Sequence, residues 1–366
     1  MSKLYIAVSI DKINIRIEAS FIANVRINAV PYSTLSVDFP VRLLLDFYMR
    51  HKSILFALLA VVLTINNVNA QQYFRIGTGG TSGTYYPIGV LVAQVVSQPN
   101  KIIASAQTSN GSLGNVIGIA SGSIESGFVQ ADVASWAQKG TGIFEGRPAL
   151  GELRLIANLY PESLHMVVRQ DSAIQSVADL KGKRIALDEV GSGTLVNARQ
   201  VLAAYGLEVT DVKAEYIKPK QASDKLKAGT LDAFFFTGGT PAMAISELAD
   251  SGVGIRLLPI DGAAAVRLRA TSSPFLFNDV IPANTYKGVG AVQTLAVGAQ
   301  WVTNEKISAD TVYQITKALF TESSQKVLRS GHPKGLFITK ENAVKGVGIP
   351  FHPGAMRFYK EIGVLK

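Results

Sequence analysis

The residues best suited to chemistry lie in one glycine-rich turn, within the run YFRIGTGGTSGTYYPIG at 73–89. Its glycines, Gly80 and Gly83 among them, remove side chains so that a ligand can approach the backbone closely. Thr81 and Ser82 add hydroxyl groups, and an apolar pattern with helical spacing follows. The free N–H groups at the start of such a helix can bind an anion.

The surrounding sequence argues against a nucleotide as that anion. A dinucleotide-binding fold places an acidic residue about 20 positions after its glycine turn, yet no Asp or Glu occurs between Arg75 and Glu125. A phosphate-binding loop needs a lysine after its last glycine, and none follows here. A small anion, best a carboxylate, fits the turn. A turn that joins strand to helix and binds nothing is the other interpretation.

Polar residues also follow the next predicted strands, at 101–106, 124–130 and 153–158. The repeated strand–turn–helix pattern predicts an open α/β sheet, in which ligands gather at the carboxyl ends of the strands. The residues at or just beyond these ends are Thr81, Ser82, Ser109, Asn110, Gln130, Asp132, Tyr160 and Glu162.

From residue 165 the pattern starts afresh, with an extended segment at 165–169 and strands at 184–187 and 231–236. Turns that carry Ser192, Gly193 and Thr194, and then Thr237 and Gly238, follow these strands. The apolar run at 292–302 is long enough to cross back to the first segment. The sequence therefore predicts two lobes that face each other across a cleft.

The composition fits a globular protein of two lobes. The chain has 366 residues, of which 17% are charged, a length that exceeds the usual single core. It has no cysteine, which excludes disulfides, thiol nucleophiles and thiolate metal sites. The formal net charge of +9 is spread thinly, without a basic run, so that we do not expect nucleic-acid binding.

The N-terminal region predicts secretion. A basic start at residues 49–52 precedes a short apolar run, and small residues end at Ala70, before Gln71. This order is typical of a cleaved secretory signal peptide, and the run is short for a membrane span. We therefore expect a signal peptide at 49–70 with cleavage near Ala70–Gln71, and we interpret residues 1–48 as a non-native extension from an over-long gene prediction.

Catalysis has little support in the sequence. Ser192 does not stand in a G-x-S-x-G elbow, and the four histidines show no metal-ligand spacing. His165 either donates to a ligand or has a structural role. We expect no enzyme, no cofactor and no metal. A secreted hydrolase acting on a small acidic substrate, and a surface or immunogenic protein with a vestigial cleft, are the alternatives.

Several motifs in order resemble one family of solute receptors. They are IGTGGTSGTYYPIG, QTSNGSLGN, FVQADVA, LYPESLHMVV, DLKGKRIALDEVGSGT, LDAFFFTGGTP and FHPGA. Across nearly all of residues 72–366 the chain resembles a TAXI-type receptor, the periplasmic binding component of one branch of the tripartite ATP-independent (TRAP) transporters. The resemblance implies a two-lobed type II periplasmic-binding-protein fold with a hinge and an interlobe cleft.

The resemblance also implies a function. Ligand-driven lobe closure would precede delivery to the TRAP permease subunits in the membrane, and the family's known ligands lean toward glutamate, glutamine and related dicarboxylates. We expect a periplasmic monomer with lobe 1 at 71–163 and 290–366 and lobe 2 at 164–289. Whether the ligand is an amino acid, a keto acid or a dicarboxylic acid stays open.

Position by position, the resemblance implies a site. One ligand carboxylate would meet Thr81, Ser82 and Gly83, beside an aromatic wall. The other polar parts of the ligand would meet both lobes, and an acidic residue would take an amino group if the ligand has one. The implied residues are Gly80, Thr81, Ser82, Gly83, Tyr85, Tyr86, Ser109, Asn110, Gln130, Asp132, Tyr160, Glu162, Ser192, Gly193, Thr194, Thr237 and Gly238.

Overall fold

The computed structural model describes residues 4–10, 13–19, 26–27, 71–271 and 273–366. They belong to two compact units, Met1–Val68 and Asn69–Lys366. In the first unit, β1 (Leu4–Ile10), β2 (Ile13–Ala19) and β3 (Arg26–Ile27) form a three-stranded antiparallel sheet. The predicted signal peptide at 49–70 lies outside the described residues, and its cleavage stays a prediction.

The second unit is built on one sheet of ten strands, in the order β5-β4-β6-β13-β7-β10-β8-β9, with β11 beside β7 and β12 beside β13. One end of the sheet has β4 (Gln72–Gly77), β5 (Ile102–Gln107) and β6 (Ser126–Gln130), which are parallel. The other end has β8 (Arg184–Ala186), β9 (Lys213–Glu215) and β10 (Ala233–Gly238), also parallel. Short strands β11 (Ile255–Leu257) and β12 (Phe277–Ile281) complete it.

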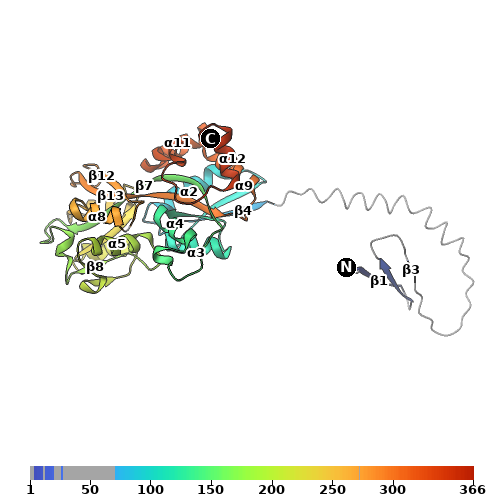
Figure 1. Cartoon of the computed structure of the whole chain (residues 1–366), viewed down its shortest axis with the longest axis horizontal. Helices are drawn as coiled ribbons and strands as arrows, with labels where there is room; N and C mark the ends of the chain where they lie inside the picture. Colours follow the sequence, from blue (N-terminus) through green and yellow to red (C-terminus); the bar gives the residue numbers. More distant parts are fainter. Residues whose placement is uncertain (1–3, 11–12, 20–25, 28–70, 272) are drawn as a thin grey trace, which may run out of the picture. The chain divides into compact units, whose positions relative to one another are not determined.

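Two long antiparallel strands, β7 (Leu153–Arg169) and β13 (Val292–Asn304), join the two ends of the sheet (Figure 1). The sequence predicts separate strands at 153–158 and 165–169, and this prediction is wrong, because β7 runs on through Pro161. Pro161 lies opposite Gly298, and the register shifts nearby, between Ala299 and Gln300. Such an irregularity in the ladder allows a strand to contain a residue that has no N–H.

Helices cover the end of the sheet that holds β4–β6. They are α2 (Tyr85–Val96), α3 (Ser112–Ser121), α4 (Ala131–Lys139), α9 (Ala309–Leu319), α10 (Glu322–Gly331), α11 (Lys340–Ala343) and α12 (Pro353–Glu361), with 3₁₀ turns η2 (Gly142–Phe144) and η5 (Pro333–Phe337). We call these strands and helices the β4 side. One core there surrounds Phe74 and Trp301, and a second, on the opposite face of the sheet, surrounds Val129 and Leu155.

The other end of the sheet has its own helices. They are α5 (Gly193–Ala204), α6 (Pro219–Lys227), α7 (Met243–Asp250) and α8 (Gly262–Thr271), with 3₁₀ turns η3 (Val177–Leu180) and η4 (Val209–Asp211). Together with β8–β11 we call them the β10 side. One core there surrounds Met166 and Phe235, and a second surrounds Val167 and Phe234.

The cores change partway along the joining strands. On β7, Ile156 to Tyr160 pack in a β4-side core, whereas Leu164 to Val168 pack in the β10-side cores. The predicted open α/β fold is therefore confirmed, with two sets of cores on one sheet. The limits of the two predicted lobes, 71–163 with 290–366 and 164–289, stay a prediction.

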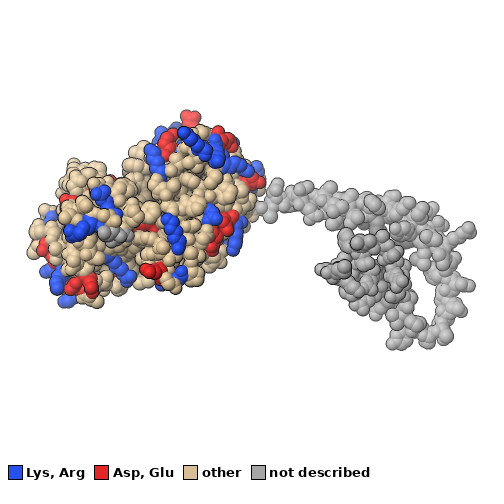
Figure 2. All heavy atoms as spheres, viewed as in Figure 1, with Lys and Arg blue, Asp and Glu red and all other residues tan. Residues whose placement is uncertain are grey.

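The surface carries both signs of charge. Figure 2 shows Lys and Arg interspersed with Asp and Glu over the visible face, without a large patch of one sign. Within the described part of the chain, no helix combines the length and apolar character that a membrane span requires.

Candidate functional site

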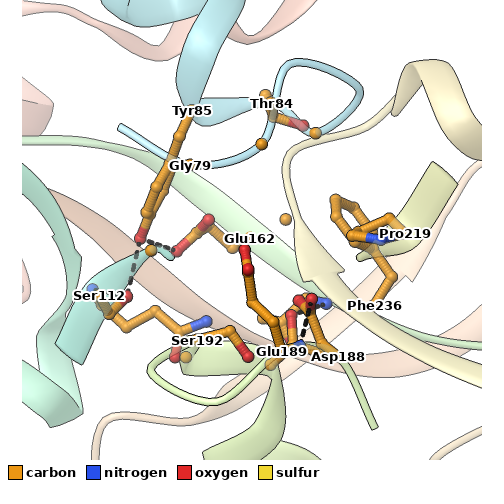
Figure 3. A pocket seen from close by; sticks show the side chains of 18 of the residues that line it. Gly79, Thr84, Tyr85, Ser112, Glu162, Asp188, Glu189, Ser192, Pro219 and Phe236 are labelled. Carbon is orange, nitrogen blue, oxygen red and sulfur yellow. Dashed lines mark hydrogen bonds between the residues drawn. The ribbon is translucent and has the colours of Figure 1, made fainter. Parts of the chain in front are cut away.

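A cavity of about 60 Å³ lies where the turns of the two sides meet (Figure 3). It is enclosed by the glycine turn before α2, the starts of α3 and α5, the middle of β7 and the end of β10. The lining residues are Gly79, Gly80, Gly83, Thr84, Tyr85, Asn110, Gly111, Ser112, Gln130, Glu162, Asp188, Glu189, Ser192, Gly193, Thr194, Pro219, Phe236, Thr237 and Gly238.

The β4 side contributes a small hydrogen-bonded group. The hydroxyl of Tyr85, at the first residue of α2, donates to Oε2 of Glu162 at 2.9 Å and lies 3.3 Å from Oγ of Ser112. The Tyr85 ring packs edge-on against Phe128, with 5.6 Å between the ring centroids. Burial raises the pKa of the Tyr85 hydroxyl well above its usual value, so that it stays a donor.

The β10 side contributes the start of α5. Ser192 is the N-cap, and its Oγ accepts from the Leu195 N–H at 3.0 Å. Oγ1 of Thr194 accepts from the Thr237 N–H at 3.1 Å, which ties α5 to β10. At Gly193 a Cβ would lie 2.3 Å from Oε1 of Gln130, on the β4 side. A larger residue at this position would therefore have to displace the amide of Gln130.

Further hydrogen bonds join the two sides around the cavity. The carbonyl of Gly191 accepts from the N–H groups of Leu113 and Gly114 at 3.0 and 3.2 Å. It thereby satisfies donors at the start of α3, which would otherwise lack partners. Gly191 has a φ of 99°, a left-handed conformation that favours glycine.

Three more bonds of this kind are present. Nδ2 of Asn110 donates to the Val190 carbonyl at 3.2 Å, Oγ1 of Thr84 to the Gly239 carbonyl at 2.6 Å, and the Ala244 N–H to the Ser82 carbonyl at 3.1 Å. With the two bonds to Gly191, we call these the bridging bonds. They hold the two sides together.

The structure brings most of the predicted site residues to this cavity. Those that line it are Gly80, Gly83, Tyr85, Asn110, Gln130, Glu162, Ser192, Gly193, Thr194, Thr237 and Gly238. Whether they bind a ligand stays a prediction.

Six predicted site residues lie elsewhere. Thr81 is exposed, and Ser82 and Tyr86 are half-buried outside the lining. Oγ of Ser109 donates to the Thr78 carbonyl and accepts from the Gly111 N–H, which is a structural arrangement. Asp132 and Tyr160 are buried away from the cavity.

Asp132 has its own partners inside the fold. Its Oδ1 accepts from the Val133 N–H at 2.8 Å, and its Oδ2 accepts from Nδ2 of Asn197 at 3.2 Å and Oγ of Ser273 at 3.5 Å. Burial raises the pKa of the Asp132 carboxyl to about 6, and these hydrogen bonds oppose the rise. The residue ties α4 to α5 and does not face the cavity.

The sequence reasoning missed two acidic residues of the lining, Asp188 and Glu189. They stand in the motif DEVGSG, between β8 and α5, where only the serine and glycine were considered. Burial raises the pKa of the Asp188 carboxyl to about 7. The position of both residues directly after a strand is the signal that could have identified them.

His165 has a structural role. It is buried, and its Nδ1 lies 2.9 Å from the Ser163 carbonyl and 3.1 Å from the Phe236 carbonyl. Its Nε2 lies 3.0 Å from the hydroxyl of Tyr286. Burial lowers the pKa of this imidazole to about 4, so that the ring is neutral. The described residues contain no group of side chains that could hold a metal ion.

Comparison with known proteins places the chain in a family. Residues 76–363 match the NMT1-like family, and the chain belongs to it. Among solved structures, it is similar to the periplasmic aliphatic sulphonate binding protein SsuA from Escherichia coli, with 17% identity and a TM-score of 0.42 over 79% of this chain and 83% of that one. It is also similar to the arginine-bound form of truncated ArgBP from T. maritima, with 12% identity and a TM-score of 0.43 over 69% and 98%.

Proposed function

We propose that this protein is a periplasmic solute-binding receptor that captures a small molecule bearing a carboxylate and hands it to a TRAP membrane permease. The observation that carries the proposal is the cavity whose walls come from strand-end turns on both sides of the sheet. A binding protein needs a site of this kind, in which polar groups from two sides converge on one space.

Lobe closure is the mechanism that this arrangement supports. Each side has its own cores, and two long strands, β7 and β13, join them. A ligand that touches both sides stabilises the closed form more than the open form and so shifts the population toward closure. The closed form would then present an altered surface to the membrane partner.

A carboxylate fits the turns at the cavity. The glycine turn and the starts of α3 and α5 bring backbone N–H groups to its edge, and helix starts favour negative charge. The α5 start supplies Ser192 and Thr194 as hydroxyl-bearing residues. The TRAP partner and the periplasmic location rest on the motif resemblance and on the predicted signal peptide.

The test is to identify what the protein binds. We expect native mass spectrometry of the full-length protein, as purified, to find a small molecule that denaturation releases chemically unchanged. Calorimetry with that molecule should then give one site per chain. Turnover of the molecule would support the hydrolase alternative. No co-purified molecule and no thermal shift across a panel of acids and amino acids would support the vestigial cleft.

The site itself is tested at α5. We expect Ser192→Ala with Thr194→Ala to weaken binding by about ten-fold or more, because each hydrogen bond to a charged group contributes roughly 1.5–3 kcal/mol. Thr321→Ala is the matched control. Thr321 is the N-cap of α10 and accepts from the Ser324 N–H at 3.2 Å, away from the cavity. Unchanged affinity in the double variant, measured by calorimetry, would contradict the placement of the site.

A further inference from the structure

The cavity lining contains acidic residues and no basic ones. Three of its lining residues, Glu162, Asp188 and Glu189, carry carboxyl groups, and no lysine, arginine or histidine is in the lining. Figure 3 shows Glu162 on one side of the space and Asp188 and Glu189 on another. Turns rich in hydrogen-bond donors suit a ligand carboxylate, but they do not explain why the same lining also has three acidic residues.

Two of the three acids lie deep in the fold. Glu162 has 1% of its surface exposed, and Tyr85 donates to it. Asp188 has 7% exposed and accepts the Glu189 N–H at 2.8 Å. Its backbone is left-handed, with a φ of 71°, a conformation uncommon outside glycine. The fold thus holds carboxyl groups at the cavity despite the cost of burying them.

The counter-charges near these groups are incomplete. Nζ of Lys218 lies 3.5 Å from Oε2 of Glu189, and this lysine is half-buried. Lys334 is buried and acts on Glu162 electrostatically, but it does not line the cavity. Asp188 has no basic side chain within ion-pair distance among the described residues. Its partners are neutral donors, namely the Glu189 N–H and the side chains of Thr194 and Ser192. Neutral donors do not balance the charge of a buried carboxylate, whereas a cation beside it does.

A metal ion is not the cation that these residues fit. The described residues contain no group of three acidic or histidine side chains close enough to hold one. The carboxyl groups are instead distributed around a small space that Gln130, Ser112 and Phe236 also line. An organic cation with several N–H donors fits carboxyl groups that are spread around a cavity, because it can donate to more than one of them.

We propose that the ligand carries a protonated amine or a guanidinium that Glu162, Asp188 and Glu189 hold, and that acids without such a group are rejected. This inference rests on the proposed function and narrows it. A zwitterion meets both features of the site, with its carboxylate toward the helix starts and its cation toward the acids. A dicarboxylate adds a negative charge where the lining is already acidic, so glutamine is favoured over glutamate.

The experiment compares matched ligands by calorimetry on the full-length protein. The pairs are glutamine with glutamate, glutamate with 2-oxoglutarate, and leucine with its keto acid; arginine and agmatine extend the range of cations. We expect binding of at least one amine-bearing compound, and at least ten-fold weaker binding of its partner acid. If a keto acid binds as tightly as its amine-bearing partner, the inference is wrong while the receptor proposal stands. If glutamate binds as tightly as glutamine, the expected preference for glutamine is wrong. If no acid or amine binds, both fail together.

A single substitution can distinguish loss of charge recognition from loss of the folded structure. We expect Glu189→Gln to reduce the preference for an amino acid over its keto acid by about ten-fold, because it removes one negative charge from the lining. The matched control is Glu305→Gln, which removes an acid paired with Arg154 outside the cavity and should leave the preference unchanged. An unchanged preference in Glu189→Gln, with normal folding by circular dichroism, would overturn the assignment of that residue.

Discussion

Two cavities lie beside the joining strands, and they differ in size and chemistry. The smaller, of about 60 Å³, has glycines, hydroxyls and three carboxyl groups in its walls. The larger, of about 530 Å³, is lined mostly by apolar and aromatic side chains from residues 158–161, 274–277 and 337–347, and has no acidic residue. Both cavities are lined by residues of the β4 side together with residues of the β10 side or of segments that adjoin it.

Under the proposed function the site is the smaller of these two cavities, so volume alone would not identify it. A binding site needs convergent polar groups that fix the orientation of a ligand. The smaller cavity has three carboxyl groups among its polar residues, whereas those of the larger cavity are Asn158, Tyr160, Asn342 and Lys345. The small volume of the first cavity agrees with the bridging bonds, which bring the two sides close together. We therefore expect substitutions at the smaller cavity to change binding, and those at the larger cavity to have little effect.

The largest effect is expected for Gly193→Val. The new side chain would overlap the amide of Gln130, because a Cβ at this position already lies 2.3 Å from Oε1. We expect affinity to fall by about ten- to a hundred-fold, since overpacking costs roughly 1–3 kcal/mol. Calorimetry on the variant measures this. An unchanged affinity would mean that the two sides need not approach at Gly193 when ligand is bound.

A smaller effect is expected from pH. Burial raises the pKa of Asp188 to about 7 in the empty protein, so that below pH 7 this carboxyl is increasingly neutral. A bound cation favours the charged carboxylate, and binding must then release a proton. We expect the affinity for an amine-bearing ligand to be higher at pH 8 than at pH 6, by up to about ten-fold for one linked proton.

The check is calorimetry in buffers with different heats of ionisation, which reports the proton release directly. Asp188→Asn should flatten the pH dependence. Burial also raises the pKa of Glu162, well above its usual value, and that of Glu189, which pairs with Lys218. A remaining slope in Asp188→Asn would assign the linkage to these two carboxyl groups instead.

The smallest effect is expected at the larger cavity. Phe277 lines it and has 43% of its surface exposed. We expect Phe277→Ala to change affinity by less than about two-fold, because exposed substitutions away from a site usually shift free energies by within roughly 0.5 kcal/mol. A ten-fold loss, measured by the same calorimetry, would give the larger cavity a part in binding and would remove the contrast between the two.

Local sequence patterns located much of the fold. Residue types that are typical of turns located the glycine turn after residue 76 and the turn that carries Ser192, Gly193 and Thr194. The alternation of strands and helices was sufficient for an open α/β sheet. The continuity of β7 was not predictable, because Pro161 resembles a strand end until its partner strand, with the shift near Ala299, is known.

The direction of side chains was the less predictable part of the site. Gln130 is the last residue of β6 and Asp132 is the second residue of α4, and a helix turns by about 100° per residue. Two residues into α4, Asp132 therefore points to Asn197 and not toward the cavity. The left-handed backbone of Asp188 likewise sets the direction in which the segment DEVGSG faces. The residue types of this motif do not predict that backbone conformation.

Under the proposed function, the bridging bonds limit how a permease could distinguish an occupied receptor from a vacant one. They join backbone and side-chain groups of the protein itself, such as the Gly191 carbonyl and the N–H groups of α3, and no ligand is needed to form them. Because both partners of each bond belong to the chain, these bonds favour the close approach of the two sides with or without a ligand. In the proposed mechanism, a permease that responded to outline alone would then be triggered by vacant receptors, so the ligand would have to prolong the closed form.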